Sequence, residues 1–268
     1  MAVEHATLGI LVLTLCMLLP VWVGIRRTRQ GHQLFVRRIK AVDAVDEACG
    51  RAAEMGRPVS FSSGLTGISP VLYACLGVLF HVAKKAATFR SKLLVPQNDA
   101  QVLAVTEDVV RDAYRESGRL SSFDPKQIQF LSDEQFAFAA GYMGLVQRER
   151  IGSAFLLGNF AAESLMLAEA GQQMGAMQIA GTVNPEQVPF FICTCDYTMI
   201  GEELFGASAY LTREPVQLGS LYGQDRAKLM WLVLILAGTL VATWNSMGEV
   251  LGWPVIPNLE QLIIWKAW

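Results

Sequence analysis

Two apolar segments near the ends of the chain constrain its architecture more than any other feature. Thr7–Ile25 has nineteen residues and no charged side chain, and Leu229–Trp244 has sixteen. A helix needs roughly 20 apolar residues to cross a hydrocarbon core, and the second segment reaches that length if it continues through Gly252. We therefore predict an N-terminal transmembrane anchor over residues 1–25 and a second transmembrane helix over residues 229–252.

The residues that flank the first segment favour an uncleaved anchor over a secretory signal peptide. A signal peptide has basic residues before its apolar stretch and a small-residue cleavage site after it. Here the preceding residues, MAVEHA, include Glu4 and no Lys or Arg, and the following residues, IRRTRQ, offer no such site.

Basic residues flank both segments on the side of the central region. Arg226 and Lys228 precede the second segment, and six cations follow the first before any acid appears. The six are Arg26, Arg27, Arg29, Arg37, Arg38 and Lys40. Because positive charge stays on the cytoplasmic side of a membrane, we predict that residues 26–228 are cytoplasmic and that both termini lie outside. Contact with anionic membrane lipid is an alternative use of the six cations.

The last segment, residues 253–268, is too short to span a membrane and is interrupted by Pro254 and Pro257. Its apolar residues are spaced as in a short helix that lies at the membrane interface. Docking on a partner protein explains the same pattern, and the sequence leaves both interpretations open.

The central region is electrically neutral. Of the 22 basic and 24 acidic residues in the chain, Lys266 and three acids (Glu4, Glu249 and Glu260) lie outside residues 26–228, which leaves 21 of each sign inside. A nucleic-acid-binding domain usually has a basic face and a high isoelectric point. We therefore predict no nucleic-acid partner.

The central region alternates between short apolar segments and longer segments with helical spacing. The short segments are predicted strands at 58–63, 92–96, 127–132, 153–160, 177–182 and 189–195. Five or six such alternations with short connections predict a mostly parallel sheet with helices on both faces. We therefore predict a Rossmann-like α/β domain over residues 57–212, preceded by a juxtamembrane helix within residues 26–56 and followed by a linker over residues 213–228.

One predicted helix, residues 70–88, is unusually apolar. Its first fourteen residues, PVLYACLGVLFHVA, are apolar or small except His81. Segments of this length are more often buried core helices than membrane spans. A third membrane-embedded segment remains the alternative, and it would reverse the topology of everything that follows.

The loop after the first predicted strand is the best candidate for a binding site. In open parallel sheets, ligands bind beyond the carboxyl ends of the strands, and this loop leads directly to a helix whose N-terminus would favour an anion. The pattern matches neither of the common glycine-rich nucleotide motifs, so a turn with a helix cap is the competing interpretation. The candidate anion-binding residues are Ser62, Ser63, Gly64, Thr66, Gly67 and Ser69.

Two carboxylates are candidates for the same crevice. Asp196 follows the last predicted strand, and Glu163 lies in the first turn of a predicted helix. Helix capping is the competing role for Asp196.

Other catalytic patterns are missing from the sequence. The three histidines, at positions 5, 32 and 81, do not lie at predicted strand ends, so no Ser-His-Asp or Cys-His system is indicated. We predict no catalytic residue, no metal site and no cofactor. Cys193 and Cys195 form a C-x-C pair without the spacing of redox or zinc motifs, and their role stays open.

The stretch AESLMLAEAGQQMGAMQIAGTVNPEQVPFFICTCDYTMIGEELFGASAYLTREP (residues 162–215) resembles a family of bacterial membrane proteins known only as a domain of unknown function. The resemblance implies a setting in the bacterial inner membrane. It implies no activity and no catalytic residue.

These observations favour a non-catalytic structural or accessory subunit of a multi-subunit membrane assembly. Its expected partners are membrane lipid and other membrane subunits or further copies of itself. The alternative is a membrane-anchored sensor that binds a small molecule or nucleotide. An enzyme that uses Asp196, Cys195 or Glu163 in the crevice is the third possibility, because this fold class hosts all three functions.

Overall fold

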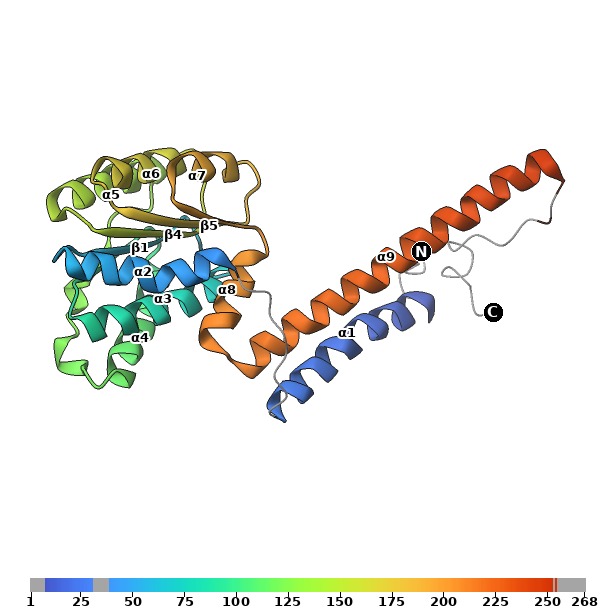
Figure 1. Ribbon diagram of the computed structural model, residues 1–268, viewed down its shortest axis with the longest axis horizontal. Coiled ribbons are helices and arrows are strands. Elements are labelled where there is room, and N and C mark those ends of the chain that lie inside the picture. Colours follow the sequence, from blue (N-terminus) through green and yellow to red (C-terminus); the bar gives the residue numbers. More distant parts are fainter. Residues whose placement is uncertain (1–7, 31–38, 253, 255–268) are drawn as a thin grey trace, which may run out of the picture. The chain divides into compact units, whose positions relative to one another are not determined.

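The computed structural model describes residues 8–30, 39–252 and 254, and the chain divides into two compact units. One unit, Val36–Arg213, is an α/β domain, and the other combines the two ends of the chain, Met1–Phe35 and Glu214–Trp268. Figure 1 shows the elements of both units, coloured in the order of the sequence.

A six-stranded sheet in which every neighbouring pair is parallel forms the centre of the α/β unit. The strands are β1 (Val59–Gly64), β2 (Leu93–Gln97), β3 (Ile128–Phe130), β4 (Ser153–Asn159), β5 (Met177–Thr182) and β6 (Tyr197–Ile200). Their order in the sheet is β3-β2-β1-β4-β5-β6, which is the strand order of the Rossmann fold. The predicted Rossmann-like parallel sheet is therefore confirmed, and the order reverses between β1 and β4.

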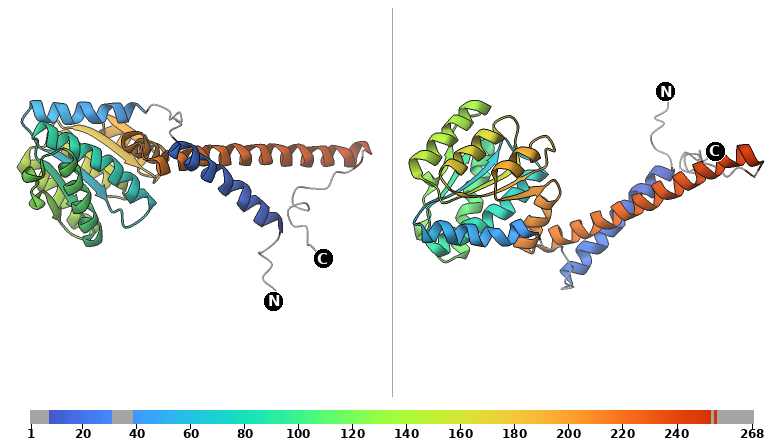
Figure 2. Two further views of the ribbon diagram at one scale, coloured as in Figure 1. Left: turned by 90° about the horizontal axis from the view of Figure 1, so that it is seen from below. Right: turned by 45° about the horizontal axis from the view of Figure 1, so that its top comes forward.

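Helices cover both faces of the sheet (Figures 1 and 2). One layer contains α2 (Lys40–Glu54), α3 (Pro70–Phe89), α4 (Ala100–Glu116) and α8 (Glu203–Thr212), and the other contains α5 (Gln135–Glu149), α6 (Ser164–Gln173) and α7 (Val188–Thr194). Successive side chains of a strand point to opposite faces. In β4, Phe155 and Leu157 accordingly pack in the core beneath the first layer, whereas Ala154 and Leu156 pack beneath the second.

Helix α3 is long and apolar enough to cross a membrane, as are two helices in the other unit. In the α/β unit, however, α3 packs against β1, β4 and the helices α2, α4 and α8. Ten of its side chains are buried there, including Leu79 and Val82. Burial between the sheet and three helices thus accounts for the apolar composition of α3.

The prediction of a strand over residues 189–195 is wrong, because all but the last of these residues belong to α7, Cys195 is its C-cap, and the last strand, β6, begins at Tyr197. A short apolar run cannot be assigned to strand or buried helix by periodicity alone. Pro189 stands in the first turn of the helix, a position that proline favours. Only Phe191 of the helix is fully buried.

The second unit contains α1 (Leu8–Arg29) and α9 (Pro215–Leu251). Both include candidate membrane spans, Ile10–Arg29 and Pro215–Gly248. Residues 215–228, predicted as part of a linker, form the beginning of α9 because no proline follows Pro215 until position 254. The predicted juxtamembrane helix is represented by α2 from Lys40 onwards. The predicted interfacial segment lies outside the described residues, apart from Pro254.

Three glycines allow α1 and α9 to pack closely. A β-carbon added to Gly219 would collide with the backbone of Ile25, and one added to Gly223 would collide with the backbone of Val21. Gly24 faces the backbone of Gly219 in the same way. Residues 219–223 thus form a G-x-x-x-G pattern, which brings membrane helices into close contact.

This packing makes Gly223 sensitive to any added side chain. We expect Gly223→Leu to lower the stability of the full chain in neutral detergent by about 1–3 kcal/mol, the usual cost of overpacking. Gln224→Leu, at the neighbouring exposed position, is the matched control and should have little effect in the same thermal unfolding measurement. Equal effects of both variants would contradict the close packing of α1 and α9.

Candidate functional site

The loops that follow β1 and β4 flank the point where the strand order reverses, which is where ligands bind in folds of this type. Ser62, Ser63 and Gly64 form the end of β1, Thr66 and Gly67 lie in the following loop, and Ser69 caps α3. The six predicted anion-binding residues therefore do lie at the carboxyl edge of the sheet.

The buried hydroxyl of Thr66 joins the two loops directly. It donates a hydrogen bond of 2.5 Å to the carbonyl of Ser63 and accepts one of 2.7 Å from the backbone N–H of Asn159. The backbone N–H of Leu65 donates to the carbonyl of Asn159 at 2.9 Å. The loop after β1 is thus hydrogen-bonded to the loop after β4 across the switch point.

Glycines at positions 64 and 158 permit this approach. Gly64 has a φ of 61° and Gly158 a φ of 151°, values that side-chain-bearing residues rarely adopt. A β-carbon at Gly64 would collide with Asn159 and Phe160, and one at Gly158 would collide with Ser63 and Thr66. In this chain the two glycines bring one loop against the other.

The backbone N–H groups at the start of the loop already donate hydrogen bonds within the protein. The N–H of Gly64 donates to Ser62 Oγ at 3.2 Å, and that of Thr66 donates to the carbonyl of Ser63 at 3.3 Å. Together with the N–H of Leu65, these are three successive donors. A phosphate in a glycine-rich loop would be bound by such donors, so this part of the loop is already satisfied.

Polar side chains before and after the loop also have partners within the protein. Ser69 Oγ accepts from the N–H of Leu72 at 3.4 Å, which is the helix-cap arrangement. Ser63 Oγ donates to Gln97 Oε1 at 2.7 Å in the buried interior. The Asp99 carboxylate is the group nearest to Gly67, 3.9 Å from the position of an added β-carbon. A carboxylate in that place disfavours an anion.

Glu163 is a fully buried carboxylate at the same edge of the sheet. It accepts hydrogen bonds from the N–H of Ala161, at 3.0 and 3.2 Å, and from Gln135 Nε2 at 2.6 Å. Asn184 Nδ2 adds a bond of 2.7 Å to the carbonyl of Phe160. Glu163 therefore ties the loop after β4 to the start of α5.

Asp196 lies at the opposite edge of the sheet from Glu163. It is exposed, precedes β6, and accepts a 2.7 Å hydrogen bond from the N–H of Gln178, which is the second residue of β5. The two predicted crevice acids are therefore not brought together. The reason is that α7 replaces the predicted strand. Asp196 therefore precedes a strand, β6, whereas it was predicted to follow one.

The C-x-C pair is split between two environments. Cys193 is exposed, whereas Cys195 is partly buried beside the Thr194 hydroxyl, 3.7 Å from its Sγ. Burial raises the pKa of the Cys195 thiol to about 12. Because the thiolate is the reactive form, Cys195 is not an activated nucleophile near neutral pH.

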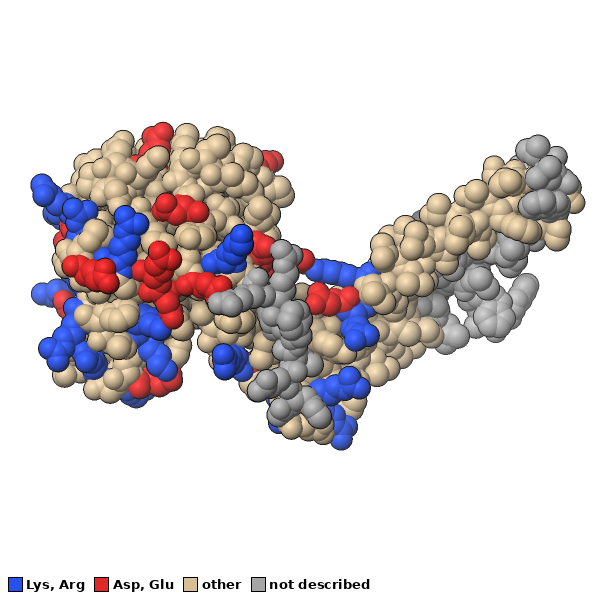
Figure 3. Space-filling view, in the orientation of Figure 1, with Lys and Arg blue, Asp and Glu red and all other residues tan. Residues whose placement is uncertain are grey.

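A second candidate site lies on the surface of the α/β unit, in a groove of about 830 Å³ between α2, α3 and α8. The groove is lined by Val42, Asp43, Asp46, His81, Lys84, Lys85, Thr88, Phe89, Tyr210, Leu211 and Arg213. Charged side chains are frequent over α2–α4 and sparse over α5–α7 in the view of Figure 3.

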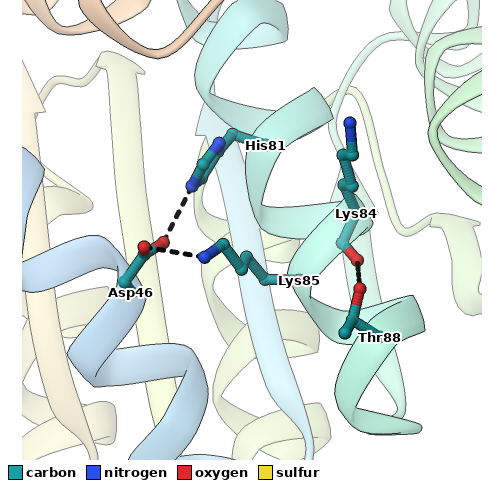
Figure 4. Close-up of polar contacts among 5 residues, drawn as sticks. All are labelled: Asp46, His81, Lys84, Lys85 and Thr88. Carbon is teal, nitrogen blue, oxygen red and sulfur yellow. Dashed lines mark hydrogen bonds and ion pairs between the residues drawn. The ribbon is translucent and has the colours of Figure 1, made fainter. Parts of the chain in front are cut away.

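The centre of this groove is an ion-pair cluster (Figure 4). Asp46 accepts from His81 Nε2 at 2.8 Å and from Lys85 Nζ at 2.7 Å, one partner on each carboxylate oxygen. Lys84 Nζ donates to Glu116 at 2.5 Å on the side of α4. The sequence-based predictions did not include this site, although the α3 residues 81, 84, 85 and 88 recur with a helical spacing that could have indicated it.

The cluster shifts the ionisation of Asp46. Partial burial opposes the charged form, but the hydrogen bonds from Lys85 and His81 outweigh it and hold the pKa of the Asp46 carboxyl below its ordinary value of 3.8. Among residues 8–30 and 39–252, no group of three or more His, Cys, Asp or Glu side chains is placed to hold a metal ion.

Comparison with known protein families gives a match over most of the chain. A family model described as "Domain of unknown function (DUF6754)" matches residues 1–250. No curated protein matches the chain, and no solved structure matches it.

Removing the Thr66 hydroxyl should loosen the contact between the two loops. We expect Thr66→Val to reduce the free energy of unfolding by about 1–3 kcal/mol, because the partly buried N–H of Asn159 loses its acceptor. Thr66→Ser retains the hydroxyl and should lose clearly less. Chemical denaturation of the full chain in neutral detergent measures both, and indistinguishable losses would contradict the bridging role.

The lowered pKa of Asp46 predicts a pH-dependent contribution to stability. The folded state favours the charged carboxylate, so the stabilisation is present above pH 3.8 and is lost as the pH falls through the lower, folded-state pKa. Asp46→Asn should therefore destabilise the chain at pH 7 and approach the native stability in acid. Asp133→Asn, at an exposed position, is the matched control, and a gap for Asp46→Asn that does not close below pH 3.8 would contradict the prediction.

Proposed function

We propose that this chain, which belongs to the family described as "Domain of unknown function (DUF6754)", is a non-catalytic structural or accessory subunit of a multi-subunit assembly in the bacterial inner membrane. Helices α1 and α9 anchor it, both termini lie outside the cytoplasm, and the Rossmann-like unit is cytoplasmic. Its partners are other membrane subunits or further copies of itself, together with membrane lipid.

The observation that carries this proposal is the contact between the loops after β1 and β4. In open parallel sheets this position is the usual ligand crevice. Here the Thr66 hydroxyl, the carbonyl of Asn159 and the backbone around Gly158 occupy it. A domain whose switch point is filled by its own loops is suited to presenting a rigid surface.

Exposed apolar side chains at the carboxyl edge of the sheet support a role in assembly. Each lies in a strand end, a following loop or the first turn of the next helix. They are Ile68, Tyr73, Phe130, Phe136, Phe190 and Ile200. Tyr73 is 63% exposed and Phe136 is 60% exposed, and aromatic side chains are enriched where proteins bind one another.

The orientation of the chain is supported by its charges. Helix α1 ends with Arg26, Arg27 and Arg29, and α9 carries Arg226 and Lys228 before its apolar part. Positive charge on this side of both helices is the pattern of a cytoplasmic flank.

The groove between α2, α3 and α8 favours a second candidate function, a membrane-anchored sensor that binds a small molecule or nucleotide. It combines charged and apolar side chains, as ligand sites do. An enzyme that uses the strand-end crevice has less support, because Glu163 and Asp196 lie at opposite edges of the sheet.

The assembly proposal is tested by extracting the native protein in mild detergent and measuring the mass and composition of the purified particle. We expect other membrane chains, or several copies of this one, in a fixed ratio. A double variant, Tyr73→Ser with Phe136→Ser, should weaken the assembly. Val105→Ser with Leu120→Ser, at exposed apolar positions away from the carboxyl-edge residues, is the control. A lone monomer in gentle conditions would overturn the proposal.

A further inference from the structure

We propose that the groove between α2, α3 and α8 binds the phosphate headgroup of a membrane amphiphile. The inference rests on the two candidate membrane helices, α1 and α9, and does not depend on the accessory role proposed above. It assigns a ligand class to a surface that lies apart from the switch point of the sheet.

Hydrogen-bond donors outnumber acceptors in the groove, which contains Lys84, Lys85 and Arg213 beside Asp43 and Asp46. Both carboxylate oxygens of Asp46 already accept, one from His81 and one from Lys85. A lysine ammonium has three donors and an arginine guanidinium five. Lys85 donates to Asp46 and Lys84 donates to Glu116, so each ammonium group keeps further N–H donors.

Arg213 adds the largest donor group. It is the left-handed C-cap of α8, with a φ of 52°, and its backbone N–H donates to Ala209. Within the part of the chain that the structure describes, its guanidinium forms no ion pair. Phosphate oxygens are the acceptors that a guanidinium fork and neighbouring ammonium groups bind best.

The existing ion pairs do not prevent this binding. The side chains of Lys84, Glu116 and Asp46 are each about half exposed, at 42, 55 and 53%. Exposed ion pairs contribute about 0–1 kcal/mol to stability, so lysine can exchange such a partner for a phosphate at little cost. Cations are favoured near the C-terminal end of a helix, and both the lysines near the end of α3 and Arg213 at the end of α8 occupy such positions.

An apolar wall adjoins these donors and indicates that the ligand has an apolar part. Phe89, Tyr210 and Leu211 line the groove together with Val42. Phe89 is 45% exposed at the end of α3. An inorganic anion would leave this wall uncovered, whereas the glycerol and upper chain of an amphiphile would cover it.

The groove is joined covalently to the second candidate membrane helix. Arg213 lines the groove, and α9 begins two residues later at Pro215. The same chain therefore carries both the groove and a helix that can cross a membrane, which favours a membrane amphiphile as the ligand.

The test measures binding to the full chain in neutral detergent by native mass spectrometry and thermal shift. The probes are dioctanoyl phosphatidic acid, dioctanoylglycerol without phosphate, and glycerol phosphate without acyl chains. We expect the phosphatidic acid to bind at least about tenfold more tightly than either of the others, because only it satisfies both the donors and the apolar wall. Glycerol phosphate binding as tightly would indicate a soluble anion as the source and would overturn the amphiphile proposal.

Two matched double variants locate the site. Lys84→Gln with Arg213→Gln should weaken phosphatidic acid binding by about tenfold, the loss expected for a charge-assisted hydrogen bond. Arg148→Gln with Arg150→Gln removes the same charge at α5, in the helix layer on the other face of the sheet, and Arg150 is also a left-handed C-cap, with a φ of 51°. This control should bind as the native chain does, and equal weakening in both variants would overturn the proposal.

Folding of the variants is checked by circular dichroism. If the site double variant does not fold, the single variants Lys84→Gln and Arg213→Gln take its place. Each should weaken phosphatidic acid binding, and glycerol phosphate should remain the weaker ligand. Native affinity in both single variants would overturn the proposal.

Discussion

The hydrogen bonds of the Thr66 hydroxyl hold the centre of the α/β unit together. At this point the strand order reverses, and the loops after β1 and β4 would otherwise diverge to follow their helices to opposite faces of the sheet. Thr66 accepts from one loop and donates within the other, at 2.7 and 2.5 Å. The glycines at 64 and 158 are required for the approach. The same contact closes the position at which a nucleotide would bind in a related topology.

The surrounding edge follows from this contact. Glu163 is held in a fully buried position by the N–H of Ala161 and by Gln135, so the loop after β4 is anchored on both sides. Apolar side chains such as Tyr73 and Phe136 then remain exposed on an edge whose backbone is fixed. A fixed apolar edge is suited to a protein partner, which explains why we place the chain in an assembly.

Much of the fold is predictable from the sequence because parallel strands buried on both faces appear as short apolar runs. The runs at 58–63, 92–96 and 153–160 identify β1, β2 and β4 to within one or two residues. The run at 189–195 fails, since PFFICTC fits a short helix equally well. That single error moves Asp196 from one edge of the sheet to the other. Site prediction is thus more fragile than fold prediction, because every strand direction must be right.

Contacts between distant segments are the part that the sequence conceals. The polar residues of 213–228 indicate a linker, yet the helix continues through them and places Gly219 and Gly223 against α1. Likewise, the helical spacing of His81 and Lys85 can be seen in the sequence of α3. Asp46, which pairs with both, and Arg213, which lines the same groove, come from helices far away in the chain. Pairing of this kind depends on the fold and not on local spacing.

The most direct test of the closed switch point is amide hydrogen exchange of the full chain without added ligand. Peptides that cover residues 62–69 and 156–163 contain the N–H groups of Leu65 and Asn159, which join the loops. Our account predicts that these two amides exchange as slowly as those of the central strand β4. Exchange as fast as in an exposed segment such as residues 119–124, with protection only after a nucleotide is added, would contradict it.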